Sequence, residues 1–182
     1  QSKPAASSLS LSATTLNTAQ STMGNAILAN LLVQAGSLAY FIEGVGDARI
    51  PIDVQALGAM YLKLRNDQRA AQVGNYLSSS FVAAPRTSAD LDGAYLFGYR
   101  PFNAAASPDI VWAEGTIQAK IALARLGLST SYAAYAVANL ALQTENFTVA
   151  PPQADREAST DATWGEYHTW PTSAAASWMV ML

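Results

Sequence analysis

The sequence predicts an all-α domain built from helical hairpins. Three observations lead to this fold class: apolar residues recur at helical spacing in several stretches, Gly, Pro, Asn and Asp separate these stretches, and no stretch has a convincing strand pattern. The 182 residues are enough for one domain with a sizeable core. Charged residues make up only 13% of the chain, and Ala, Ser, Thr and Leu take their place. Small residues at this density suit helices that pack closely against one another.

The first expected helix runs from about Leu16 to Phe41. Residues 1–15 are rich in Ser, Ala and Thr and are expected to form a flexible arm, so that a single domain covers residues 16–182. No charged residue stands between positions 4 and 42, but polar residues interrupt the apolar ones, which favours a packed helix over a membrane span. The apolar stripe contains Met23, Ile27, Leu31, Leu38 and Ile42, with Gln34 in the gap, a bend at Gly36, and Gly44 and Gly46 after the helix end.

A helical hairpin is expected next. Pro51 and Asp53 open its first helix, with Asp53 as a candidate cap, and Asn66 with Asp67 separate this helix from a second one that ends at about Val82. A connection of two or three residues makes the two helices antiparallel neighbours. The expected apolar sides carry Val54, Leu57, Tyr61 and Leu64 in the first helix and Val73, Leu77 and Phe81 in the second.

A long irregular stretch from about Ala83 to Ile110 follows, and loops of this length in compact domains are more often functional than idle. After it, one helix is expected to begin near Trp112 and to stop at Gly127. A partner helix, capped by Ser129 or Thr130, is expected to end near Phe147. The last helix is expected to start at Pro171 and to reach the chain end.

Charge and residue usage exclude several classes of function. The net charge of −3 and the scattered Lys and Arg residues provide no basic surface, so a nucleic-acid partner is not expected. The chain has no Cys and one His, so neither a disulfide framework nor a transition-metal site is expected, and no cofactor is predicted. The lack of Cys is compatible with the cytoplasm and with secretion, and a secreted or periplasmic location is favoured.

Residues 164–179 hold three of the four Trp residues and the only His. This aromatic stretch also contains a carboxylate, Glu166, and leads into an apolar helix. Such a combination is typical of a pocket wall.

Three segments, Ile52–Gly58, Val111–Thr116 and Glu166–Ala175, resemble in this order the C-terminal half of six-hairpin glycosidase-like proteins. The resemblance covers about Ile50–Leu182 and implies an α/α toroid of helical hairpins with a carbohydrate cleft at one end. The helices expected here amount to about half of such a ring. A second chain, or a missing N-terminal half, is therefore the expected structural partner. The resemblance assigns no catalytic residue.

The two candidate catalytic residues are Glu166 and Glu114. Glycoside hydrolysis needs a carboxylic acid that protonates the departing oxygen and a carboxylate that activates water or attacks directly. Glu114 begins a helix near Trp112, where the helix dipole favours an ionised base; alternatively, it only stabilises the helix terminus. Glu166 lies between Trp164 and Trp170, where desolvation would raise its pKa and suit an acid; a structural role is the alternative.

Carbohydrate binding is assigned to aromatic and polar residues near these carboxylates, because an aromatic face matches the apolar face of a sugar ring. His168 has a core hydrogen-bonding role as its alternative, Asp92 a turn-forming role, and Tyr99 a role in anchoring the long loop. Trp178, within the last helix, is expected to be a core residue. The full set of predicted substrate contacts is Trp112, Trp164, Tyr167, His168, Trp170, Asp92 and Tyr99.

These residues favour a glycoside hydrolase that acts on an oligosaccharide or polysaccharide. One alternative is a polysaccharide lyase or sugar epimerase on the same toroid, in which His168 or Tyr167 moves a proton. The other is a non-catalytic carbohydrate-binding or assembly domain.

Overall fold

The computed structural model describes residues 12–47, 49–84, 86–87, 95–103, 108–128, 132–134, 136, 158–159, 166–167 and 172–181, and this part of the chain is mainly helical. Its helices are α1 (Ala13–Leu31), α2 (Ile52–Leu64), α3 (Arg69–Ser80), α4 (Ala113–Leu126) and α6 (Ser173–Met179). One hairpin joins β1 (Leu32–Ala35) to β2 (Leu38–Phe41). Two further antiparallel pairs are very short: β3 (Arg86–Thr87) with β4 (Tyr95–Leu96), and β5 (Ala158–Ser159) with β6 (Glu166–Tyr167).

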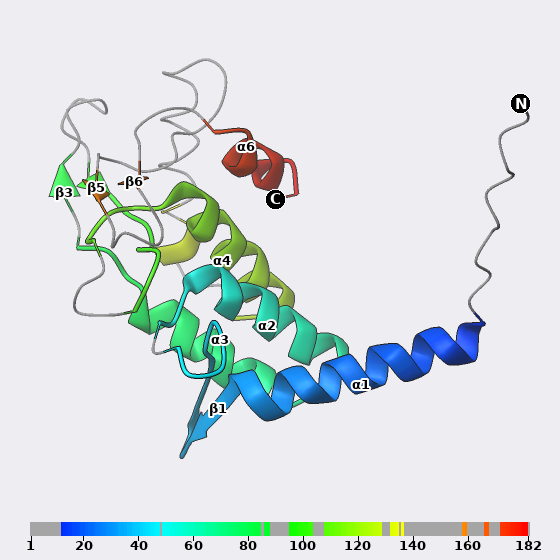
Figure 1. Cartoon of the computed structure of the whole chain (residues 1–182). Coiled ribbons are helices and arrows are strands. Elements are labelled where there is room, and N and C mark those ends of the chain that lie inside the picture. Colours follow the sequence, from blue (N-terminus) through cyan, green and yellow to red (C-terminus); the bar gives the residue numbers. More distant parts are fainter. Residues whose placement is uncertain are drawn as a thin grey trace, which may run out of the picture.

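The long first helix was predicted wrongly in its second half. It begins at Ala13, where the Ser12 hydroxyl accepts the Thr15 N–H at 3.1 Å, and it stops at Leu31. The chain then turns back as the β1–β2 hairpin, with Ala35 paired to Leu38. In Figure 1, α1 projects away from the bundle formed by the other helices.

The hairpin forms because its turn and its strands favour it locally. Of the two turn residues, Gly36 has φ of 62° and Ser37 a negative φ, which is the pattern of a type II′ turn. The Gln34 amide, expected on a helical stripe, instead donates to the carbonyl oxygens of Gly36 and Leu38 at 2.8 and 3.1 Å. The turn is therefore closed by both backbone and side chain.

The hairpin of α2 and α3 and the end of α4 confirm the prediction from sequence. Asn66 adopts φ of 55° in the short turn between α2 and α3, and Gly127 adopts φ of 73° directly after α4. The largest buried cluster joins these three helices and the aromatic loop. It contains Ile52, Ala56, Tyr76, Leu77, Phe81, Tyr99, Ala119, Ala122, Leu123 and Ala133.

The apolar side expected for α2 is wrong, because Leu57 and Leu64 are exposed. The buried side of α2 instead carries small and amide side chains, among them Gln55, Ala56 and Ala59. The small residues let α3 and α4 approach α2 closely, and the same side carries the fully buried Ile52 and Leu62.

Helices α2 and α4 lie side by side and run in the same direction. At one end, Ile52 N donates to the Pro101 carbonyl and Trp112 N donates to the Tyr99 carbonyl, both at 2.9 Å, so one short segment contacts the start of each helix. At the other end, Lys63 and Leu126 line the same pocket. The starts of both helices therefore meet at one end of the bundle.

The final helix begins at Ser173, two residues later than Pro171, with the Thr172 hydroxyl as its cap. Its buried Ala175 joins a cluster with residues of α4, including Ala113 and Ile117. None of the described helices is both long and apolar enough to span a membrane.

Gly115→Ala is expected to lower the free energy of unfolding by about 1–3 kcal/mol, because it overpacks the contact between α2 and α4. The added Cβ would lie 2.6 Å from Ile52 Cγ2 and would also meet the Trp112 ring. Gly24→Ala in α1 is the matched control, since its Cβ would meet only the ends of flexible side chains. Urea unfolding of both variants is the measurement, and a Gly115 variant as stable as wild type would contradict this packing.

Candidate functional site

Glu114 is the second residue of α4, and its carboxylate is held by two donors. Gln118 Nε2 and Trp178 Nε1 each donate to Glu114 Oε1 at 3.1 Å. Gln118 lies one turn further along α4, whereas Trp178 comes from α6, 64 residues away. Because both donors contact the same oxygen, they fix the orientation of the carboxylate. The other oxygen, Oε2, can still accept a proton or a hydrogen bond from a hydroxyl group.

Trp178 was expected as a plain core residue, but it is half-buried and its indole N–H reaches Glu114. The prediction missed this because helical spacing shows where a side chain points and not which group its N–H meets. A partly buried indole does need a hydrogen-bond acceptor. That requirement, together with the scarcity of carboxylates in this chain, is the signal that could have suggested the pair.

Gln118 completes this cluster. It is only 3% exposed, and its Oε1 has no hydrogen-bond partner among the described residues although its Nε2 is bonded to Glu114. Buried amide oxygens almost always accept a hydrogen bond. The cluster therefore has one buried acceptor that the described part of the chain leaves unsatisfied.

Trp112 and Tyr99 have different surroundings. Trp112 directly precedes α4 and is half-buried, and its ring lies against Gly115. In the sequence, Trp112 stands two residues before Glu114, whereas Gln118 stands four residues after it. Tyr99 is fully buried, and its backbone N–H donates to the Thr116 hydroxyl at 3.0 Å. Tyr99 thus anchors the long loop, which was the alternative to its predicted contact with substrate.

Most of the predicted aromatic wall lies outside the described residues. This is the case for Trp164, His168, Trp170 and Asp92. For Glu166 and Tyr167 the structure describes the backbone, which pairs in β6 with Ser159 and Ala158 of β5. The described residues thus bring together Glu114, Trp112 and Trp178.

The starts of α2 and α4 share one local arrangement. Asp53 and Glu114 are each the second residue of their helix. Two residues later, each helix has a buried polar side chain that bonds the backbone: Gln55 Oε1 accepts the Phe41 N–H at 2.7 Å, and Thr116 Oγ1 accepts the Tyr99 N–H at 3.0 Å. Both side chains also donate to the carbonyl four residues earlier. The two helix starts are therefore structurally equivalent.

Asp53 is not the cap expected from the sequence. Pro51 occupies the capping position, and the Asp53 carboxylate accepts the N–H of its neighbour Val54 at 2.9 Å. Burial raises the pKa of Asp53 above the ordinary value, against the opposing effect of the backbone N–H groups of Val54 and Asp53. This half-buried carboxyl has no ion-pair partner within the described segments.

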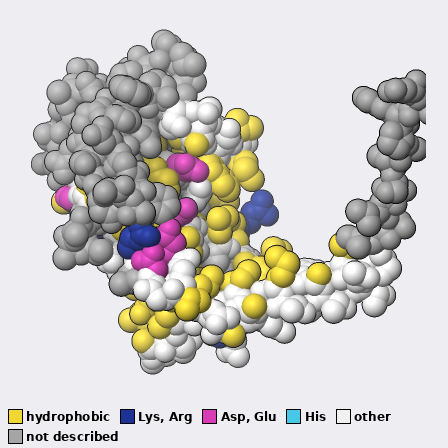
Figure 2. Space-filling model, in the orientation of Figure 1, with side chains coloured by type: hydrophobic (Ala, Val, Ile, Leu, Met, Phe, Trp, Pro, Cys, Tyr) yellow, Lys and Arg dark blue, Asp and Glu magenta, His cyan; other side chains and the backbone are white. Residues whose placement is uncertain are grey.

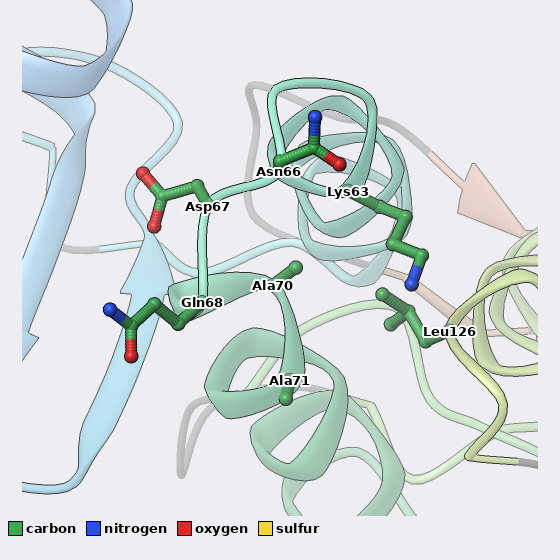
Figure 3. Close-up of a pocket in the computed structure, with 7 residues that line it drawn as sticks. All are labelled: Lys63, Asn66, Asp67, Gln68, Ala70, Ala71 and Leu126. Carbon is green, nitrogen blue, oxygen red and sulfur yellow. The ribbon is translucent and has the colours of Figure 1, made fainter.

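A pocket of about 390 Å³ lies at the opposite end of the bundle, between the α2–α3 turn and the end of α4. In Figure 3 the Lys63 side chain extends towards Leu126, whereas Gln68 points away from both. Lys63 is ten residues after Asp53, which corresponds to about 15 Å along a helix. The pocket is therefore separate from the carboxylate end.

Metal ligands do not cluster in the part of the chain that is described, since no three His, Asp or Glu side chains there lie close enough to hold an ion. Comparison with protein-family models, with curated proteins and with solved structures found no match. The functional argument accordingly depends on the geometry of the site.

Proposed function

We propose that this protein is a carbohydrate-active hydrolase that cleaves glycosidic bonds in an oligosaccharide or polysaccharide. The observation that carries the proposal is the Glu114 carboxylate, which two donors hold at a helix start, one of them the Trp178 indole, with Trp112 two residues earlier in the sequence. A fixed carboxylate suits activation of a water molecule, and indole faces suit sugar rings.

Glu114 is the base in this mechanism, because two donors hold its carboxylate in one orientation at the start of α4. The mechanism also needs an acid, and the sequence alone favours Glu166 for it, on account of the tryptophans at positions 164 and 170. Trp112, together with the aromatic residues of the 164–170 stretch, forms the sugar-binding wall.

The test is an assay of the purified protein on a panel of oligosaccharides and polysaccharides, with release of reducing ends as the readout. Turnover of one sugar class supports the proposal. Products that absorb in the near ultraviolet would indicate a lyase instead. Binding without turnover, unchanged when both Glu114 and Glu166 are replaced by Gln, would indicate a binding domain and overturn the hydrolase proposal.

The chain is further proposed to form half of an α/α toroid. Repeated hairpins in a ring need equivalent units whose inner helices run in the same direction, and α2 and α4 have equivalent starts and the same direction. A half-ring also has a flank that other hairpins cover. Exposed apolar side chains extend along α1 and onto the neighbouring flank of the bundle (Figure 2). The large apolar residues of α1 and α2 that are exposed are Leu16, Met23, Ile27, Leu57 and Leu64.

The proposed occupant of this flank is a further set of helical hairpins, from a second chain or from outside these 182 residues. Sedimentation of the purified protein is expected to show a species larger than the 19.2 kDa monomer. Met23→Glu combined with Leu57→Glu is expected to shift this species to the monomer, because charge on the apolar flank opposes its burial. A wild-type monomer with full hydrolase activity would contradict the half-ring.

A further inference from the structure

We propose that Asp53 is the proton donor that works with Glu114 across the starts of α2 and α4. This inference rests on the proposed hydrolase function and gives the same site its second carboxyl group. If Asp53 is the acid, the site does not need Glu166 as a proton donor.

The position of Asp53 is the first argument. Asp53 and Glu114 occupy the second position of two adjacent helices that run in the same direction. The neighbouring residues Ile52 and Gly115 face each other so closely that Gly115 has no room for a Cβ. Asp53 and Glu114 therefore stand at the same level of the bundle, and each is next to a residue of the contact between α2 and α4.

The environment of Asp53 is the second argument. A carboxylate that serves only structure is normally paired with a cation or caps several backbone N–H groups. Asp53 accepts the N–H of Val54 and its own N–H, and it forms no ion pair with any described residue. Its half-buried position raises its pKa, so it holds a proton to higher pH than an ordinary aspartate. A general acid must be protonated in just this way before it acts.

The third argument is the unsatisfied amide oxygen of Gln118. Gln118 is 3% exposed and donates to Glu114, yet its Oε1 has no partner in the described ranges. A buried acceptor beside the carboxylate calls for a hydroxyl or N–H donor. Sugar hydroxyl groups are donors of this kind. The unsatisfied oxygen of Gln118 is therefore a second indication of a ligand site at this end of α4, in addition to the helix terminus.

The reaction balances with these two groups and water. The Asp53 carboxyl gives its proton to the glycosidic oxygen as the bond from that oxygen to the anomeric carbon breaks. Glu114 takes a proton from a water molecule whose oxygen bonds to the anomeric carbon. Asp53 leaves the step as a carboxylate and Glu114 as a carboxylic acid, and a proton exchange through solvent restores both.

The decisive experiment compares two leaving groups. On the sugar that the wild-type protein hydrolyses, Asp53→Asn is expected to lower kcat at least about 100-fold. On a dinitrophenyl glycoside of the same sugar, which needs no protonation to depart, the loss is expected to be less than about tenfold. Glu114→Gln is expected to lose activity on both substrates, because the base is needed whichever group departs.

The inference would be overturned if Glu166→Gln lost activity on the natural sugar while Asp53→Asn kept it. It would also be overturned if Asp53→Asn lost activity equally on the natural sugar and on the dinitrophenyl glycoside. These results are distinct from failure of the proposed function, in which the wild-type protein itself turns over no sugar. They therefore separate the identity of the acid from the existence of the activity.

A stability measurement gives a second readout that is independent of substrate. Because the pKa of Asp53 is higher in the folded protein than its ordinary value of 3.8, wild-type stability falls as pH rises above that value and through the folded pKa. Asn cannot ionise, so Asp53→Asn is expected to gain stability relative to wild type between pH 4 and pH 7. A variant whose relative stability falls over this range would show a paired, structural carboxylate and contradict the acid role.

Discussion

Glu114→Gln is expected to lower kcat for glycoside hydrolysis by about 10²- to 10⁴-fold while the protein stays folded. The amide has nearly the shape of the carboxylate, and its oxygen can still accept the N–H groups of Gln118 and Trp178. What the variant loses is the capacity to take a proton from water. Steady-state kinetics on the sugar identified by the panel, with circular dichroism to verify folding, provide the measurement.

Trp178→Phe is the control that separates the base from its orientation. Phe keeps the aromatic ring but removes the N–H that donates to Glu114. Since Gln118 still holds the carboxylate, the expected loss in kcat is small compared with that of Glu114→Gln. Full activity in the Glu114 variant would exclude it as the base.

Gln55→Leu is expected to lower the free energy of unfolding by about 3 kcal/mol, the largest stability effect predicted for a single side chain here. Gln55 is fully buried, accepts the Phe41 N–H and donates to the Phe41 carbonyl, both at 2.7 Å. Leu would fill the space but leave both backbone groups of Phe41 buried without a partner. The β1–β2 hairpin would then lose the hydrogen bonds that Gln55 provides between Phe41 and α2.

Gln72→Leu is the matched control for this prediction. Gln72 accepts one side-chain hydrogen bond, from Gln34 Nε2 at 2.9 Å. Because this bond is exposed to water, it is expected to contribute under about 0.5 kcal/mol. Urea unfolding at constant pH would measure both variants. Equal small losses would show that the bonds to Phe41 contribute little.

The sequence was sufficient for helices whose ends carry strong local signals. The start of α2 after Pro51, the turn at Asn66 and the stop of α4 at Gly127 each depend on the backbone preference of one or two residues, and such preferences act without tertiary context. The β1–β2 hairpin was missed because a helical stripe can be traced through Leu31 and Leu38 by placing Gln34 in the gap. The Gly36-Ser37 pair was the opposing signal, and it prevails in the structure.

The exposed side of α2 shows a second limit. Spacing groups Leu57 and Leu64 on one face, but which face becomes buried depends on how closely the neighbouring helices approach. The same limit affected the site. Glu114 and Trp112 could be chosen from their own positions in the chain. The bond from Trp178 to Glu114, and the lack of an ion pair at Asp53 among the described residues, depend on which residues meet after folding.

The bond between Trp178 and Glu114 links the site to a segment with little stability of its own. Helix α6 has seven residues and one buried residue, so it can detach from α4 by local opening at a much lower free energy than global unfolding requires. Each such opening removes the whole Trp178 side chain from Glu114, the indole ring as well as the N–H, whereas Trp178→Phe removes only the N–H. Mild warming or low denaturant would therefore reduce catalysis before the α2–α3–α4 bundle melts, and amide hydrogen exchange in α6 would follow the loss of activity.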